Sequence, residues 1–313
     1  MTDSLACRFN LQCPICASVV DIEVDTGLCR QNGHRFQRAD GIWRFLPLTR
    51  EVQFRDFMRE YRVIRAAEGW SGSTPQYYRA LPRAADDDPQ SGIWKIREKN
   101  FQRLAESLGR AAPRKILDAG AGNGWLSNHL AQRGHTVAAL DLSDDAEDGL
   151  GAWKNYENYF ECYQAEIDRL PFREDEFDRV IFNAALHYTP NLGQTLCEAK
   201  RVLKAEGQIV VLDSPYYGDA RSGARMIAER EATFARRYGF QRKAQTVGFL
   251  TRAELERAAQ DAGLTLDIRP ADLEWDTRLR RALAQWRTRR EPAQFPLIVL
   301  RKASMWVCGY VSV

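Results

Sequence analysis

The chain has 313 residues, of which 44% are hydrophobic, and this is enough for one large α/β domain with a small additional unit. A formal net charge of +3 argues against a dominant polyanionic partner, although it neither requires nor excludes nucleic acid. No apolar run reaches the length of a membrane span, and the N-terminus lacks the basic and apolar blocks of a signal peptide. We therefore expect a cytoplasmic protein with no membrane partner, and an odd number of cysteines, seven, fits a reducing compartment.

Residues 1–48 contain five cysteine and histidine side chains, which are common metal ligands. Cys13 and Cys16 form a C-x-x-C pair that can hold one face of a tetrahedral zinc ion, and Cys29 with His34 suits a second turn that completes the site. Cys7 is the alternative to His34 as the fourth ligand. A redox pair or buried thiols would be the competing interpretation, but a redox pair needs no third and fourth partner at this spacing. The pattern predicts a structural site for Zn2+ without a catalytic role.

Residues 49–100 are expected to form a helical and loop segment over a ligand cleft. Apolar residues recur at helical spacing over residues 51–68 and again over 94–108, which predicts two helices. The intervening residues are rich in turn formers and acids, which predicts a surface loop. Tyr77 belongs to an aromatic part of this loop that either lies across the mouth of the cleft or packs the loop onto the domain.

The stretch from residue 115 to 143 reads as strand, glycine turn, helix and strand. A first apolar run ends at Asp118, and a second ends at Asp141, about 20 positions beyond the first glycine. Three glycines, Gly120, Gly122 and Gly124, let the backbone turn sharply and come close to a ligand. An acid in the position of Asp141 can accept both hydroxyls of a ribose. The third glycine is displaced by one from the dinucleotide signature, so a pyrophosphate, and with it a nicotinamide oxidoreductase, is not favoured.

The run DAGAGNG closely resembles the first motif of class I S-adenosylmethionine-dependent methyltransferases. Three further blocks, EIDRLPF, FREDEFDRVIFNAALHY and RVLKAEGQIVVLD, resemble later parts of the same family, including the enzymes of ubiquinone and menaquinone biosynthesis. The resemblance covers residues 101–213 and extends more loosely to 302. It implies that Asp118 and the three glycines hold the amino-acid end of S-adenosylmethionine and that Asp141 binds its ribose. By the same resemblance the remaining cofactor contacts are Leu142, Glu166, Ile167 and Asn183, with Glu166 near the adenine amino group.

The methyl acceptor is expected at the edge where the strand before His187 ends, because open α/β sheets bind ligands beyond the carboxyl ends of their strands. His187 is the candidate base, and the alternative is a residue hydrogen-bonded to the backbone. Tyr217 is expected on the rim of the same cleft, as the second candidate catalytic residue. Next come a helix to about Tyr238, a capped helix at 249–264, a strand at 264–268, a basic helix at 274–290 and an antiparallel last strand at 296–301.

The N-terminal segment resembles the zinc ribbon of the rRNA guanine methyltransferases, including the apolar run GIWRFLP that leaves the ribbon. We expect a Rossmann-like, seven-stranded class I methyltransferase sheet at residues 101–302, preceded by the ribbon and followed by a tail at 303–313 that docks on the domain or on another subunit. The expected reaction is methyl transfer from S-adenosylmethionine to a small-molecule acceptor. The alternatives are methylation of RNA, favoured by the ribbon and the basic helix, and a non-catalytic module that binds RNA or a partner.

Overall fold

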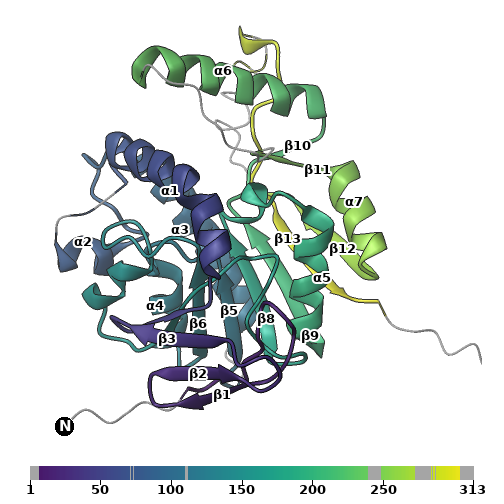
Figure 1. Cartoon of the computed structure of the whole chain (residues 1–313). Helices are drawn as coiled ribbons and strands as arrows, with labels where there is room; N and C mark the ends of the chain where they lie inside the picture. Colours follow the sequence, from purple (N-terminus) through teal and green to yellow (C-terminus); the bar gives the residue numbers. More distant parts are fainter. Residues whose placement is uncertain are drawn as a thin grey trace, which may run out of the picture.

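The protein is described from a computed structural model, which covers residues 7–70, 72, 74–109, 112–238, 248–271, 283, 285 and 287–303. An eleven-stranded sheet lies at the centre of this part of the chain, in the order β1-β2-β3-β4-β7-β6-β5-β8-β9-β13-β12 (Figure 1). Its strands are β1 (Val20–Glu23), β2 (Thr26–Cys29), β3 (Arg35–Ala39), β4 (Ile42–Arg44), β5 (Lys115–Ala119), β6 (Thr136–Asp141), β7 (Glu161–Gln164), β8 (Phe177–Asn183), β9 (Leu203–Leu212), β12 (Leu264–Arg269) and β13 (Leu297–Lys302).

Helices cover both faces of the sheet. They are α1 (Leu48–Glu68), α2 (Pro75–Ala80), α3 (Ser91–Leu108), α4 (Trp125–Gln132), α5 (Leu192–Val202), α6 (Ala220–Tyr238) and α7 (Arg252–Asp261), with short 3-10 turns η1 (Leu150–Asn155) and η2 (Leu186–Tyr188). No helix in these described ranges combines the length and the apolar character needed to cross a membrane. The predicted helices at 51–68, 94–108 and 249–264 therefore correspond to α1, α3 and α7.

Successive residues of β5 show why the chain builds two layers of core. Ile116 packs with the apolar side chains of α3 and α4, whereas Leu117 packs with those of α5 and α7. Side chains alternate between the two faces of a strand, so a strand apolar at every position is buried on both sides. Strands β7, β6, β5, β8 and β9 run parallel, and β13 is antiparallel to β9 as predicted.

The four N-terminal strands do not stand apart from the sheet. They pair with one another in antiparallel fashion, and β4 then pairs in parallel with β7, from Ile42 opposite Cys162 to Arg44 opposite Gln164. The expected exit segment of the ribbon is thus a strand that joins the N-terminal unit to the edge of the main sheet. This pairing covers the edge of β7, which would otherwise present unpaired backbone groups.

The expected loop between α1 and α3 is wrong in part, because it contains α2. Thr74 caps this helix, with its hydroxyl accepting a hydrogen bond from the backbone N–H of Tyr77 at 3.3 Å, and Pro75 occupies the first helical position. Strand β9 begins immediately after α5, and Gly207 lies within the strand.

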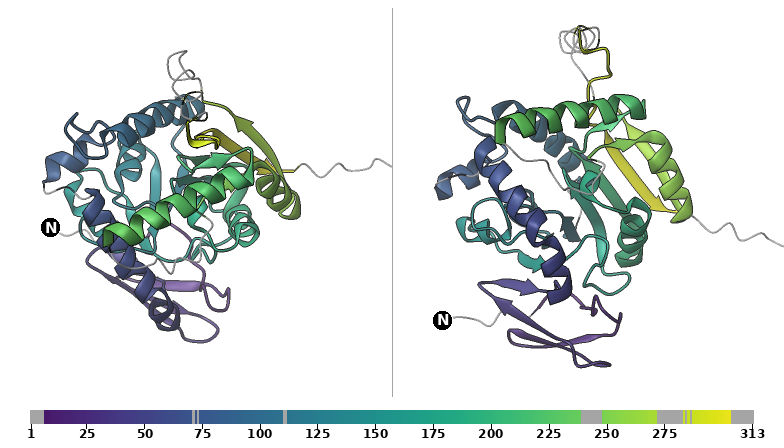
Figure 2. Two further views of the ribbon diagram at one scale, coloured as in Figure 1. Left: turned by 90° about the horizontal axis from the view of Figure 1, so that it is seen from above. Right: turned by 45° about the horizontal axis from the view of Figure 1, so that its top comes forward.

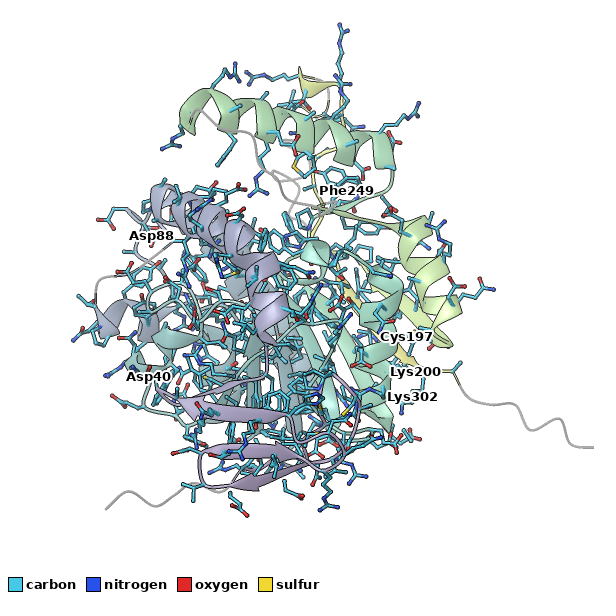
Figure 3. All side chains as sticks on the ribbon, in the orientation of Figure 1. Asp40, Asp88, Cys197, Lys200, Phe249 and Lys302 are labelled. Carbon is cyan, nitrogen blue, oxygen red and sulfur yellow. The ribbon has the colours of Figure 1, made fainter. Side chains whose placement is uncertain are left out.

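Helix α6 lies beyond the carboxyl ends of the parallel strands, on the same side as α1 (Figures 1 and 2). It begins near the short sheet of β10 (Tyr216–Tyr217) and β11 (Leu250–Thr251), and Phe249 lies beneath it (Figure 3). A Cβ at Gly223 of α6 would lie 2.4 Å from the ring of Phe249, so this glycine allows the close approach. The predicted helix at 274–290 and the tail at 303–313 lie almost wholly outside the described residues.

Candidate functional site: a glycine turn and an adjoining cavity

The glycine turn follows β5 directly and leads into α4. All three of its glycines have positive φ, at 81° for Gly120, 54° for Gly122 and 80° for Gly124. A Cβ at Gly120 would lie 2.3 Å from the Cβ of Ala185, whereas the space around Gly122 is open to 4 Å. The backbone N–H of Gly122 donates a hydrogen bond of 2.8 Å to Oδ2 of Asp141. Asp141 can reach the turn because β5 and β6 are neighbouring parallel strands.

Asp118 is fully buried beneath this turn. Its Oδ2 accepts a hydrogen bond of 2.7 Å from the hydroxyl of Ser127, and its Oδ1 has no hydrogen-bond partner among the described residues. Burial raises the pKa of Asp118 to about 7, and the nearby carboxylate of Asp141 acts in the same direction. An unsatisfied buried oxygen is costly, so this carboxyl is suited to a ligand that brings a hydrogen-bond donor or a positive charge.

Asp141 ends β6 and is held by the backbone on both sides. Its Oδ1 accepts from the N–H of Ser143 at 2.8 Å, while its Oδ2 takes the N–H of Gly122. Burial raises its pKa. The carbonyl of the neighbouring Leu142 accepts a bond of 3.2 Å from the side chain of Gln164. These contacts fix the carboxylate beside the glycine turn.

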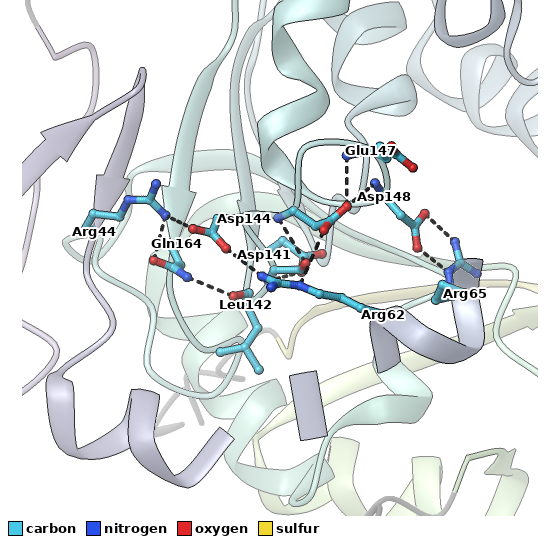
Figure 4. A network of polar contacts seen from close by, with 11 residues as sticks. Arg44, Arg62, Arg65, Asp141, Leu142, Asp144, Glu147, Asp148 and Gln164 are labelled. Carbon is cyan, nitrogen blue, oxygen red and sulfur yellow. Dashed lines mark hydrogen bonds and ion pairs between the residues drawn. The ribbon is translucent and has the colours of Figure 1, made fainter. Parts of the chain in front are cut away.

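Arginines of helix α1 contact acidic residues of the loop that follows β6, as Figure 4 shows. Arg62 contacts Asp144 at 3.1 Å, and Arg65 donates a hydrogen bond of 2.8 Å to Asp148. Both aspartates belong to the loop that follows β6. Further along, Arg50 of α1 donates to Oε2 of Glu166 at 2.9 Å. Glu166 is buried, whereas the side chain of Arg50 is 26% exposed, so this ion pair is partly shielded from solvent. Helix α1 is thus joined by ion pairs to the loops that follow β6 and β7.

Ile167 is half-buried and packs against the core beside Glu166. Asn183 is the last residue of β8, and its side-chain Oδ1 is buried without a partner among the described residues. Of the expected cofactor contacts, Asp118, Asp141 and Asn183 come from three strands of the same parallel sheet, and the glycines lie between the first two. The carboxyl ends of these strands meet at one edge, where α1 crosses.

A cavity of about 430 Å³ adjoins this edge. Its lining comes from α1, α3, η2, α6 and the end of β9, and includes Tyr61, Arg97, His187, Asp213 and Arg230. A cavity of this volume falls within the range of small-molecule sites. The side chain of His187 was correctly expected at this edge.

His187 is buried, and burial with the nearby guanidinium groups of Arg230 and Arg97 lowers its pKa to about 3. Its Nδ1 lies 3.1 Å from the hydroxyl of Ser214, so the imidazole contacts a side chain, while its backbone carbonyl accepts from Gly248. The centre of its ring lies 4.2 Å from that of Tyr188, with the two rings tilted by 39°. The side chain is therefore neutral at physiological pH.

Tyr217 does not lie on the rim of the cavity, and this expectation is wrong. The side chain is fully buried in β10, and its ring packs edge-on against Phe249 at 5.7 Å. Pairing of β10 with β11 turns this residue into the interior. Tyr77 belongs to α2, where it packs against Tyr78 at 5.5 Å and against the apolar core, which is the second of its two expected roles; it does not line the cavity.

The four expected metal ligands lie together in the N-terminal unit. The ligand atoms of Cys13, Cys16, Cys29 and His34 all lie within 4.8 Å of one another. The Sγ atoms of Cys16 and Cys29 are 3.3 Å apart, and the Sγ of Cys13 is 3.3 Å from Nδ1 of His34. Cys7 is not part of the cluster, since its thiol contacts the hydroxyl of Tyr163 at 3.4 Å.

Two residues that the sequence analysis missed are Arg97 and Asp213, which line the cavity from α3 and from the end of β9. Asp213 is buried; its Oδ1 accepts from the amide of Asn100 at 2.6 Å, and its Oδ2 has no described partner. The position of Asp213 directly after a buried strand was the sequence signal that could have identified it as a site residue. Arg97 lay on the polar side of a helical pattern, where an arginine usually contacts solvent.

Comparison with known proteins agrees with this geometry. Residues 117–211 match a family described as a methyltransferase domain. Over 114 residues, the chain is 35% identical to a malonyl-[acyl-carrier protein] O-methyltransferase of Erwinia pyrifoliae, a match that covers 35% of this chain and 40% of the relative. It is 29% identical over 120 residues to a demethylmenaquinone methyltransferase of Tropheryma whipplei, covering 38% of this chain and 49% of that protein. The chain spans less than half the length of these curated relatives.

Among solved structures, the fold is similar to a chain in a complex of a methyltransferase activator from Haloferax volcanii with its proposed methyltransferase. The TM-score is 0.50 at 19% identity, over 72% of this chain and 98% of the other. This likeness concerns the fold alone. Residues 117–211 are therefore similar to a methyltransferase domain, and the fold is that of a Rossmann-like α/β sheet.

Proposed function

We propose that this chain is an S-adenosylmethionine-dependent methyltransferase that acts on a small-molecule acceptor. The observation that carries the proposal is the set of polar groups at the ends of β5, β6 and β8. Asp118 and Asn183 each keep a buried oxygen without a described partner, and Asp141 is fixed beside an open turn at Gly122. All of these residues lie within residues 117–211, the stretch that matches the methyltransferase family model.

The residues present fit this cofactor. In the proposal, Asp118 and the three glycines hold its amino-acid part, Asp141 and Leu142 its ribose, and Glu166 and Ile167 its adenine, with Asn183 beside the reacting end. The cofactor supplies a methyl group activated by a positive sulfonium, which leaves S-adenosylhomocysteine. The chain contributes alignment and exclusion of water, because methyl transfer is an in-line displacement. Helix α1 is placed to exclude water, since it covers the cleft through Arg50, Arg62 and Arg65.

The acceptor is proposed to occupy the cavity beside His187. A neutral imidazole accepts a hydrogen bond well but holds a proton weakly when its pKa is about 3. If Nδ1 donates to Ser214, Nε2 is left as the acceptor atom. His187 would then orient a donor group of the acceptor and take its proton only as the methyl group is transferred. Tyr217 has no place in this step, because it is buried away from the cavity.

The N-terminal cluster is proposed to hold one Zn2+ ion with a structural role. A tetrahedral site with metal–sulfur bonds of about 2.3 Å has ligand atoms about 3.8 Å apart. Three of the separations among Cys13, Cys16, Cys29 and His34 are 3.3, 3.3 and 3.9 Å, and all four ligand atoms lie within 4.8 Å of one another, which is close to this spacing. The ion would lock the strands that extend the edge of the main sheet at β4.

Calorimetric titration with S-adenosylhomocysteine tests the cofactor part of the proposal. We expect one binding site per chain, and a loss of affinity of at least tenfold in Asp141→Ala, because two hydroxyl contacts to a charged group are removed. The matched control is Asp86→Ala, which removes an exposed carboxylate paired with Lys95. Absence of binding to the wild-type protein would reject the proposed function, and equal binding by both variants would reject the assigned ribose site.

A further inference from the structure

The cavity beside His187 holds two arginines that no carboxylate neutralises directly. Arg97 and Arg230 both line it, and neither forms a hydrogen bond or an ion pair with another residue in the described part of the chain. The Nε atom of Arg97 is buried without a partner. Both guanidinium groups are close enough to His187 to lower its pKa. A guanidinium removed from water needs hydrogen-bond acceptors, so the cavity is suited to an anion.

The other charges of the cavity wall are already paired or partly satisfied. Arg65 is bound to Asp148, and Glu68 accepts a hydrogen bond of 3.0 Å from the indole of Trp70. Asp213 offsets part of the charge of Arg97, but its Oδ1 is held by the amide of Asn100. Arg97 and Arg230 therefore share the cavity wall with two carboxylates, Glu68 and Asp213, so the formal charges of this wall balance. Neither guanidinium forms an ion pair with these carboxylates within the described residues, and the buried Nε of Arg97 still lacks an acceptor.

Aromatic side chains complete the wall. Arg97 lies over the rings of Trp70 and Trp94, at 4.9 Å and 4.7 Å from their centres, and this stacking fixes its planar group. Tyr61, Tyr188 and Phe295 line other parts of the cavity. A cavity of about 430 Å³ with such walls suits a flat, compact body rather than a polymer.

We propose that this cavity binds an acidic acceptor, a compact and partly aromatic molecule whose carboxylate or phosphate group is held between Arg97 and Arg230. The inference rests on the proposed function, since it takes the cavity to be the acceptor site of a methyltransferase. It adds the chemical class of the acceptor. It also assigns Arg97 and Arg230 to specificity rather than to the methyl transfer itself.

The test uses the full chain saturated with S-adenosylhomocysteine and measures binding of benzoate and phenyl phosphate by ligand-observed NMR. Benzamide is the neutral probe of similar shape. We expect at least one acid to bind with a dissociation constant of about 1–10 mM, the range for molecules of this size, and benzamide to bind at least tenfold more weakly. The comparison of benzoate with phenyl phosphate shows which anionic group is preferred.

Arg97→Gln and Arg230→Gln should each weaken binding of the preferred acid about tenfold or more. The controls remove a positive charge from the same helices: Lys95→Gln on α3 and Arg221→Gln on α6, whose side chains are exposed. These controls should bind the acid like the wild type. All four variants should keep their affinity for S-adenosylhomocysteine, which shows that they are folded.

Three results would overturn the proposal. They are equal binding of benzamide and the acids, failure of both acids to bind at about 10 mM, and losses of binding in the controls that equal those in the two arginine variants. Failure of S-adenosylhomocysteine to bind would instead reject the proposed function, and the two results are read from separate titrations.

Discussion

Replacing Asp118 with Asn tests whether burial raises the pKa of this carboxyl, so that it keeps its proton up to about pH 7. In the folded chain burial raises the pKa of Asp118 from 3.8 to about 7, while the unfolded chain keeps a value near the ordinary one. Between these two values the folded protein binds a proton that the unfolded chain has released. The free energy of unfolding therefore falls as the pH rises through this window, and the loss is complete above pH 7.

The size of the effect follows from the difference between the two pKa values. From pH 5 to pH 8 the ionisation of Asp118 should lower the free energy of unfolding by about 2–3 kcal/mol, a contribution that Asn cannot make. The side chain is fully buried, so solvent does not screen this effect. Asn retains an oxygen that can accept the hydrogen bond from Ser127.

Urea denaturation of both proteins at pH 5 and pH 8 measures this difference. We expect Asp118→Asn to gain stability relative to the wild type as the pH rises, by about 2–3 kcal/mol. Asp86→Asn is the control, because its carboxylate is exposed and its pKa is lowered by Lys95, so it stays ionised at both values. A wild-type-to-variant difference that is the same at both pH values would refute the reasoning, since Asp118 would then be ionised throughout.

Three further predictions concern the turn, the metal cluster and the cavity. Gly122→Ala should lower the free energy of unfolding by about 1–2 kcal/mol in urea denaturation, because of the positive φ alone. Gly120→Ala should lower it further, because the added Cβ would also collide with a neighbouring alanine. Equal losses in the two variants would contradict this. The purified chain should contain one zinc ion by elemental analysis. Cys16→Ser should lose the ion and melt at a lower temperature, whereas Cys197→Ser, a control at an exposed cysteine, should keep it. Full zinc content in both variants would exclude the site. The rate of methyl transfer should show no titration by His187 between pH 6 and 8, because its pKa is about 3; a rise near pH 6.5 that His187→Asn abolishes would show that the group is solvated.

Local signals predicted the turn and its neighbours well. Glycines at residues 120, 122 and 124 all adopt positive φ. The acid at the end of the next strand, Asp141, accepts a hydrogen bond from the backbone of the turn. The N-terminal cluster was predictable for the same reason, since Cys13, Cys16, Cys29 and His34 come from turns of one short unit. Helix α2 had a local signal as well, because Thr74 followed by Pro75 is typical of a helix start, but the acids that follow concealed it.

Contacts between distant segments were not predictable from these patterns. The pairing of β4 with β7 joins residues more than a hundred positions apart, and any edge strand with free backbone groups could have paired there. The ion pair between Arg50 and Glu166 likewise depends on where α1 crosses the sheet. Tyr217 was misplaced because the partner strand that buries it, β11, is too short to leave a pattern.

The most direct test of the proposed function is transfer of a labelled methyl group from S-adenosylmethionine into an extract of the cells from which the gene comes, with and without ribonuclease. We predict label in small compounds, unaffected by ribonuclease, and a strong decrease with Asp141→Ala. Label in large material that ribonuclease degrades would contradict the small-molecule acceptor and favour RNA. Absence of any transfer, together with no binding of S-adenosylhomocysteine, would leave the chain as a non-catalytic module.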